Sequence, residues 1–173
     1  PNNFGRVFRA AVVDNPNNPL GARLFIISRN AQKQLIISPD TLKDNLSVYL
    51  NQYRLMSESI DILDAPIVNL SLKYSISVEK GYNFQSVINE ANSSLKDYFK
   101  VENFQINQPI VIADISNLIL NTPGVLSLIE LKFTGMSGTV DQISYSNFTY
   151  VTSENLSRGM YFPPPGGIFE IKY

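Results

Sequence analysis

The sequence predicts an α+β fold: a mostly antiparallel sheet with about three helices packed on it, followed by a β-rich C-terminal segment. Three observations support this prediction. Residues 66–79 alternate apolar and polar side chains with the period of a half-buried strand. Several other stretches repeat apolar residues at helical spacing. From residue 66 to residue 134 the expected order is strand, helix, helix, strand.

The stretch 66–79 is predicted to be the central strand. Its even positions from Val68 to Val78 are apolar, and its odd positions from Asn69 to Glu79 are polar. One face is therefore expected to be covered, while the other suits water or a second protein. A single covered face favours antiparallel pairing, because parallel sheets are usually covered on both sides.

Two shorter strands, 7–13 and 24–28, are expected before it, joined by the Asx-rich and Pro-rich turn Asp14–Pro19. We disfavour a calcium loop there, because the turn lacks the mid-loop Gly and the terminal Glu that such a loop uses. A helix is predicted to begin with Ser38 as N-cap and Pro39 as the first helical residue. Its core-facing positions are expected to be Leu42, Leu46, Tyr49, Leu50 and Tyr53.

The most tempting carboxylate pair is Asp61 and Asp64. Acid and base carboxylates of a hydrolase must converge on one substrate. Residues three apart on a strand point to opposite faces, so we do not expect a dyad. Solvation or a turn-forming role is the preferred interpretation.

A second helix is expected after the cap Asn83, and a third from about 112–114 until the Thr122-Pro-Gly stop. The stripe of the second helix, expected to lie on the sheet, comprises Phe84, Val87, Ile88, Ala91, Leu95, Tyr98 and Phe99. The third helix carries Ile115, Leu118 and Ile119. Strands are then predicted at 125–134, 143–152 and, after a stiff polyproline turn, 168–173.

Composition excludes several function classes. The formal charge is -1 with scattered basic residues, which favours neither nucleic acid nor an anionic membrane as partner. The chain has no Cys and no His, so thiolate chemistry, zinc-thiolate sites and the commonest general base are missing. We expect no catalytic residue, cofactor, nucleotide or metal site. Five Asn-x-Ser/Thr triplets are attributed to chance.

The chain divides by composition into 1–65, an N-terminal β/α part; 66–134, the core; and 135–173, a β-rich end. One compact domain is the alternative. Because the sequence begins at Pro1 and stops within an expected strand, we interpret it as part of a longer protein.

Several stretches in order along nearly the whole chain resemble the C-terminal part of the baseplate wedge protein of T-even-type contractile-tailed phages. The region from Tyr49-Leu50 through Pro123-Gly-Val125 is similar to the broader baseplate J-like family. The stretches that carry the resemblance are Asn2-Asn-Phe-Gly5, Arg9-Ala-Ala-Val12, Asp14–Pro19, Thr41–Asn45, Tyr49-Leu50, Ser59–Asn69 and Tyr161–Tyr173.

The resemblance implies a structural role without enzymatic activity. In that family, copies of the wedge protein pair and close into a ring that joins the wedges around the tail hub. It therefore implies a virion baseplate location, a homodimer and other baseplate wedge proteins as partners. Two alternatives stay open: a carbohydrate- or ligand-binding domain, prompted by nine tyrosines, and a hydrolase using a Ser-Lys or carboxylate pair.

The final segment is the predicted contact region. A terminal strand after a rigid Pro-Pro-Pro turn can add to an exposed sheet edge of a partner. Pairing only within its own domain is the competing interpretation. The candidate interface residues are Tyr161, Phe162, Phe169, Ile171 and Tyr173.

Overall fold

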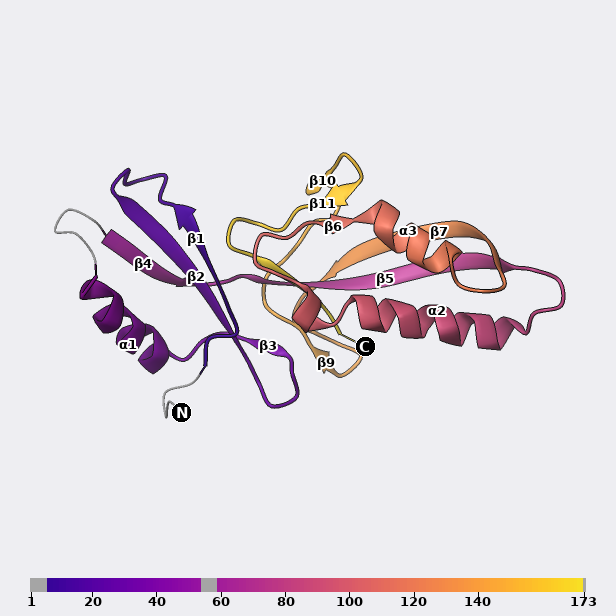
Figure 1. The fold of residues 1–173 in the computed structure, drawn as a ribbon, viewed down its shortest axis with the longest axis horizontal. Coiled ribbons are helices and arrows are strands. Elements are labelled where there is room, and N and C mark those ends of the chain that lie inside the picture. The colour runs from indigo at the N-terminus through magenta and orange to yellow at the C-terminus, as the bar shows by residue number, and fades with distance from the viewer. Residues whose placement is uncertain (1–5, 54–58, 173) are drawn as a thin grey trace. The chain divides into compact units, whose positions relative to one another are not determined.

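The structure is a computed structural model that describes residues 6–53 and 59–172, and it consists of two compact units (Figure 1). The first unit contains the described residues up to Ile67, together with 105–107 and 164–168. The second contains 68–104, 108–163 and the described residues from 169. The predicted division at 65/66 and 134/135 stays a prediction.

The first unit is built on strand β2. β2 (Gly21–Arg29) pairs antiparallel with β1 (Arg9–Asp14) and with the short β3 (Leu35–Ile36), and parallel with β4 (Ser59–Asp64). Its stretch from Phe25 to Ser28 is buried. Side-chain oxygens of Asn15 and Asn18 accept the amides of Asn17 and Leu20, which confirms the Asx-closed turn between β1 and β2.

Helix α1 (Asp40–Asn51) differs from its prediction in two ways. Its N-cap is Pro39 rather than Ser38, because the buried Ser38 hydroxyl lies 2.9 Å from that of Ser28 instead of capping the helix. The predicted core stripe is also wrong at its far end. Leu42 is buried, but Tyr49 and Tyr53 are 55% and 70% exposed and lie against each other.

The second unit is organised around β5 (Ile67–Val78), the middle strand of the order β12-β5-β7. β7 (Val125–Met136) pairs antiparallel with β5, and β12 spans Ile168–Ile171. The central position, the antiparallel pairing and the α+β class are confirmed. Burial does not alternate as predicted, because Asn69 is fully buried, whereas Leu72 and Ile76 are only half-buried.

Helices α2 (Phe84–Tyr98) and α3 (Ile112–Leu120) connect β5 to β7, as predicted (Figure 1). Asn83 caps α2 by accepting the amide of Ser86 at 3.1 Å. The α2 stripe is buried except at Phe84, which is 57% exposed, and at Ile88 and Tyr98, which are half-buried. The Tyr74 hydroxyl donates to Asn92 Oδ1 at 2.7 Å and links β5 to α2.

The remaining elements of the second unit are short. They are the 3-10 helix Val101–Asn103 and the strands β6 (Ile110–Val111), β8 (Thr139–Val140), β9 (Ile143–Ser144), β10 (Leu156–Ser157) and β11 (Met160–Tyr161). The strand predicted at 143–152 is therefore wrong beyond β9. Within this unit the ring of Phe99 contacts those of Phe104 and Phe133, and the ring of Phe133 also contacts that of Tyr161.

Candidate protein interface

Strand β7 carries two β-bulges that expose aliphatic side chains. Ser75 pairs with Glu130 and Ile76 with Leu128, which leaves Ile129 without a partner on β5. A second register shift, between Ser77 and Val78, skips Leu126 in the same way. The extra residue of a bulge breaks the alternation of faces. Accordingly, Leu126 and Ile129 are 63% and 70% exposed.

The same end of the unit exposes further large apolar side chains. Tyr82, in the loop between β5 and α2, packs against the turn between α3 and β7. A Cβ on Gly124 in that turn would come within 2.5 Å of the Tyr82 ring. The backbone fixes this turn, because Glu79 N donates to Gly124 O at 2.9 Å and Gly124 has a φ of +87°. Figure 1 shows the ends of β5 and α3 beside the starts of α2 and β7.

We call this surface the apolar end of the second unit. Its members are Tyr82 (52% exposed), Phe84 (57%), Leu120 (43%), Leu126 and Ile129. Single exposed apolar residues are ordinary on a protein surface, whereas a large contiguous group of them indicates a contact site. Burying such side chains against another apolar surface is favourable, because it removes apolar area from water.

The predicted interface residues occupy different environments. Tyr161, Phe169 and Ile171 are buried, with 8%, 2% and 8% of their surface exposed, whereas Phe162 is 40% exposed. Tyr173 lies outside the described residues. The ring centroids of Phe169 and Tyr150 are 5.6 Å apart. The Tyr150 hydroxyl donates to the Phe162 carbonyl oxygen at 2.7 Å.

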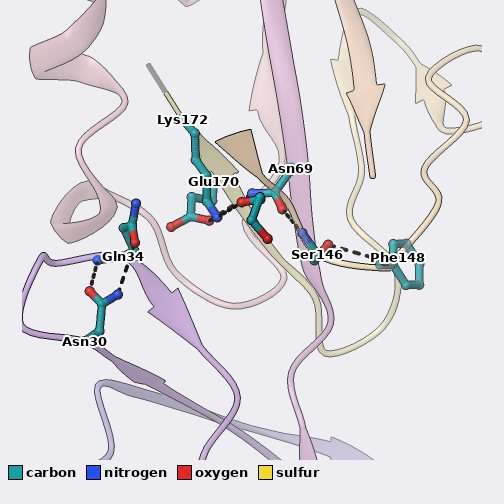
Figure 2. Close-up of polar contacts among 8 residues, drawn as sticks. Asn30, Gln34, Asn69, Ser146, Phe148, Glu170 and Lys172 are labelled. Atoms are coloured by element: carbon teal, nitrogen blue, oxygen red, sulfur yellow. Dashed lines mark hydrogen bonds and ion pairs between the residues drawn. The ribbon is translucent and has the colours of Figure 1, made fainter. Parts of the chain in front are cut away.

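A polar cluster, shown in Figure 2, holds β12 in the second unit. Asn69 Nδ2 donates to Glu170 Oε2 at 2.8 Å, and Asn69 Oδ1 accepts the Ser146 amide at 2.7 Å. Lys172 Nζ lies 3.8 Å from Glu170 Oε2 and 2.5 Å from the Ser144 carbonyl oxygen. Glu170 is only 3% exposed. A buried carboxylate is costly without partners, and Asn69 and Lys172 are the partners of this one.

The two carboxylates considered for catalysis have separate partners. Asp61 accepts from Asn15 Nδ2 at 2.9 Å, and Asp64 accepts from Lys43 Nζ at 2.8 Å. Hydrogen bonds from Lys43 to Asp40 and then to Asp64 raise the pKa of Lys43 above its usual value. That Asp61 and Asp64 do not form a catalytic dyad stays a prediction.

Within the described residues, no group of three His, Cys, Asp or Glu side chains is placed to hold a metal ion. None of the described helices is both long and apolar enough to cross a membrane.

The apolar end was not predicted from the sequence, but a signal for part of it is present. In the segment Val125-Leu-Ser-Leu-Ile-Glu-Leu, the doublets Val125-Leu126 and Leu128-Ile129 interrupt the period of two. Adjacent apolar residues in a strand place one of the pair on the wrong face unless a bulge intervenes. The doublets therefore mark the bulges.

Comparisons with known proteins relate the chain to baseplate proteins. Residues 68–145 match the family model of the baseplate J-like protein C-terminal domain. No curated protein sequence matches the chain. A chain in the cryo-EM structure of the anti-feeding prophage baseplate, six-fold symmetrised, matches with a TM-score of 0.53 and 9% identity. The match covers 88% of this chain and 29% of that chain, so it shows a shared fold over part of a longer protein.

Proposed function

We propose that the chain is a structural, non-enzymatic component of a phage-like contractile tail baseplate, because residues 68–145 match the family model of the baseplate J-like protein C-terminal domain. Its place in that assembly is a baseplate wedge, where copies of the chain associate and help to form the ring that joins wedges around the hub. The family match carries the proposal. It spans β5 through β9, the region that also presents the apolar end.

The apolar end is the contact that we assign to self-association. Protein interfaces have apolar cores enriched in aromatic residues, with a polar rim. The apolar end has two aromatic and three aliphatic side chains, and the exposed Glu79 and Lys80 lie beside it in the sequence. Burying these side chains against a second copy removes apolar surface from water, worth about 25 cal/mol per Å².

The final segment supplies a second contact through Phe162. Tyr161, Phe169 and Ile171 support it from inside the unit, since they are buried. A chain shortened to end at Gly159 would lack β12, so it could not separate a contact made by the final segment from the loss of this strand from the sheet. Substitution of the exposed Phe162 leaves β12 in place.

Light scattering after size-exclusion chromatography tests self-association. We expect the unmodified chain to be dimeric or larger at micromolar concentration. The double variant Leu126→Asp with Ile129→Asp should be monomeric, because charge at an apolar contact is desolvated without a partner. Thr134→Asp, also an exposed site on β7, is the matched control and should behave like the unmodified chain.

Phe162→Ser separates the two contacts. A weaker dimer in this variant supports the contribution of the final segment, and an unchanged one removes Phe162 from the interface. Unaltered circular dichroism and thermal midpoints must accompany each result. A monomeric unmodified chain at high concentration contradicts self-association.

A further inference from the structure

The polar cluster of Figure 2 brings a lysine and an asparagine to the same carboxylate oxygen. Glu170 Oε2 accepts a hydrogen bond from Asn69 Nδ2 at 2.8 Å and lies 3.8 Å from Lys172 Nζ. A lysine amine is a nucleophile once it is neutral, and the side-chain amide of asparagine contains an acyl carbon that an amine can attack. The cluster therefore holds a nucleophile, an acyl group and a carboxylate that contacts both.

The surroundings of the cluster exclude most water. Asn69 has no exposed surface, and the side chains of Glu170 and Lys172 are 2% and 17% exposed. The centroid of the Tyr145 ring lies 5.8 Å from Lys172 Nζ. Burial penalises an ammonium and a carboxylate more than an amine and a carboxylic acid. It therefore favours transfer of a proton from Lys172 to Glu170, which leaves a neutral amine.

The Asn69 amide has a hydrogen-bond partner on each side. Its Oδ1 accepts the backbone amide of Ser146 at 2.7 Å. A donor at this position stabilises the negative charge that develops on Oδ1 when an amine attacks Cγ. Its Nδ2, the nitrogen that has to leave, already contacts Glu170 Oε2 and can receive a proton there. Every group that acyl transfer needs has a defined atom in the cluster.

We propose that Lys172 and Asn69 form an isopeptide bond within the second unit, with Glu170 as the proton carrier. The Lys172 side chain first rotates, because Nζ now donates to Ser144 O at 2.5 Å. Glu170 takes one proton from the ammonium, and the neutral Nζ attacks Asn69 Cγ. Glu170 passes this proton to Nδ2 and removes another from Nζ. The bond between Nζ and Cγ is then complete, the bond between Cγ and Nδ2 breaks, and ammonia takes the last proton from Glu170 and leaves as ammonium.

The bond would join two neighbouring strands of one sheet, β5 and β12. Asn69 and Glu170 are 101 positions apart in the sequence, so the cross-link would close a long loop. A cross-link of this kind stabilises the fold mainly by restricting the unfolded chain, and more so for a longer loop. The reaction occurs once in each chain, needs no other reactant and does not depend on self-association.

Mass spectrometry of the purified full chain tests the proposal. After several days at neutral pH, we expect an intact mass that is lower by one ammonia than the sequence requires. A tryptic digest should contain a branched peptide, and its fragmentation should place the bond between Asn69 and Lys172. A chain that keeps its full mass, or a loss of ammonia at other residues, would overturn the proposal.

Three variants test the assigned roles. Lys172→Arg and Glu170→Gln should keep their full mass, because a guanidinium is not a nucleophile and a glutamine side chain does not carry a proton. Lys73→Arg, at an exposed lysine on β5, is the matched control and should lose ammonia like the unmodified chain. Circular dichroism shows whether each variant folds, and the mass of the unmodified chain decides the proposal if one does not. Loss of ammonia in a folded Lys172→Arg or Glu170→Gln variant would overturn it.

Discussion

At the scale of single residues, Asn69 has the most consequential environment in the second unit. It is fully buried at a position where the strand pattern predicts a solvent-facing side chain. Its amide pairs with a carboxylate on β12 and with the backbone of the segment after β9. One side chain therefore joins three segments that are far apart in the sequence.

Asn69→Ala should lower the free energy of unfolding by roughly 2–4 kcal/mol, because Glu170 and the Ser146 amide both lose a buried partner. Urea denaturation measures the change. Ser75→Ala, on the same face of β5, is the control and should cost less than about 0.5 kcal/mol. Equal midpoints for the two variants would contradict a structural role for the cluster.

Tyr150 is expected to make the free energy of unfolding fall at high pH. Burial raises its pKa to about 12, and nearby Tyr161 adds to the effect. Because the folded pKa lies above the unfolded value of 10.0, the neutral hydroxyl stabilises the fold fully below pH 10. This contribution, on the order of 2 kcal/mol, is lost as the pH rises toward 12.

Denaturation at pH 8 and pH 11.5 checks this expectation. Burial also raises the pKa values of Tyr74 and Tyr98, so part of the loss will remain in any Tyr150 variant. Tyr150→Phe is expected to start less stable at pH 8, because the hydrogen bond to Phe162 O is absent. It should then lose less stability on the way to pH 11.5 than the unmodified chain.

At the scale of elements, β5 was the most predictable part of the fold. Its period of two, the Asn83 cap of α2 and the Thr122-Pro-Gly stop of α3 are local signals, and the structure has a strand and two helices there, although burial along β5 does not alternate. Failures came from distant partners. Ser38 contacts Ser28 instead of capping α1, and the Ser146 amide donates to Asn69 rather than to a neighbouring strand.

The apolar end was likewise predictable only where its signal is local. The doublets in 125–129 indicate bulges, but the exposure of Tyr82, Phe84 and Leu120 depends on how the helices pack. Amphipathic spacing cannot tell a buried stripe from one that extends past the end of the sheet. Phe84, predicted to be in the core, is the clearest case.

The burial gradient along β5 predicts a matching gradient in mutational cost. Leu70→Ala should cost about 2–5 kcal/mol by cavity formation, because Leu70 has no exposed surface. Leu72→Ala should cost less than about 2 kcal/mol, since Leu72 is half-buried and lines a cavity of about 330 Å³ between β5 and α2. Thermal or urea midpoints rank the two, with Ser71→Ala as a near-neutral control. The reverse order would contradict the packing described for this strand.

At the scale of the whole molecule, the two units are interleaved along the sequence. The chain passes between them after residues 67, 104, 107, 163 and 168. Within the first unit, the returning segments bind each other and the core. Asn107 Oδ1 accepts the Gly166 amide at 2.6 Å, and a Cβ on Gly166 would lie 2.3 Å from the Phe25 ring.

A chain ending at Ile67 should therefore fail to form the first unit by itself. It lacks both returning segments, and Phe25 would lose the backbone that covers it. We expect poor dispersion in its amide NMR spectrum and no cooperative melting. A well-dispersed spectrum would show that the returning segments are dispensable, and the full chain provides the reference spectrum.

The bulges of β7 have a consequence for solubility. A twelve-residue strand at the edge of a sheet is a template on which further copies could add without limit. The extra residues Leu126 and Ile129 break the regular spacing of its outward amides over the first half. Glu130 and Lys132 place charges on the strand next to them. The irregularity that exposes these apolar side chains thereby also discourages fibril growth along the same edge.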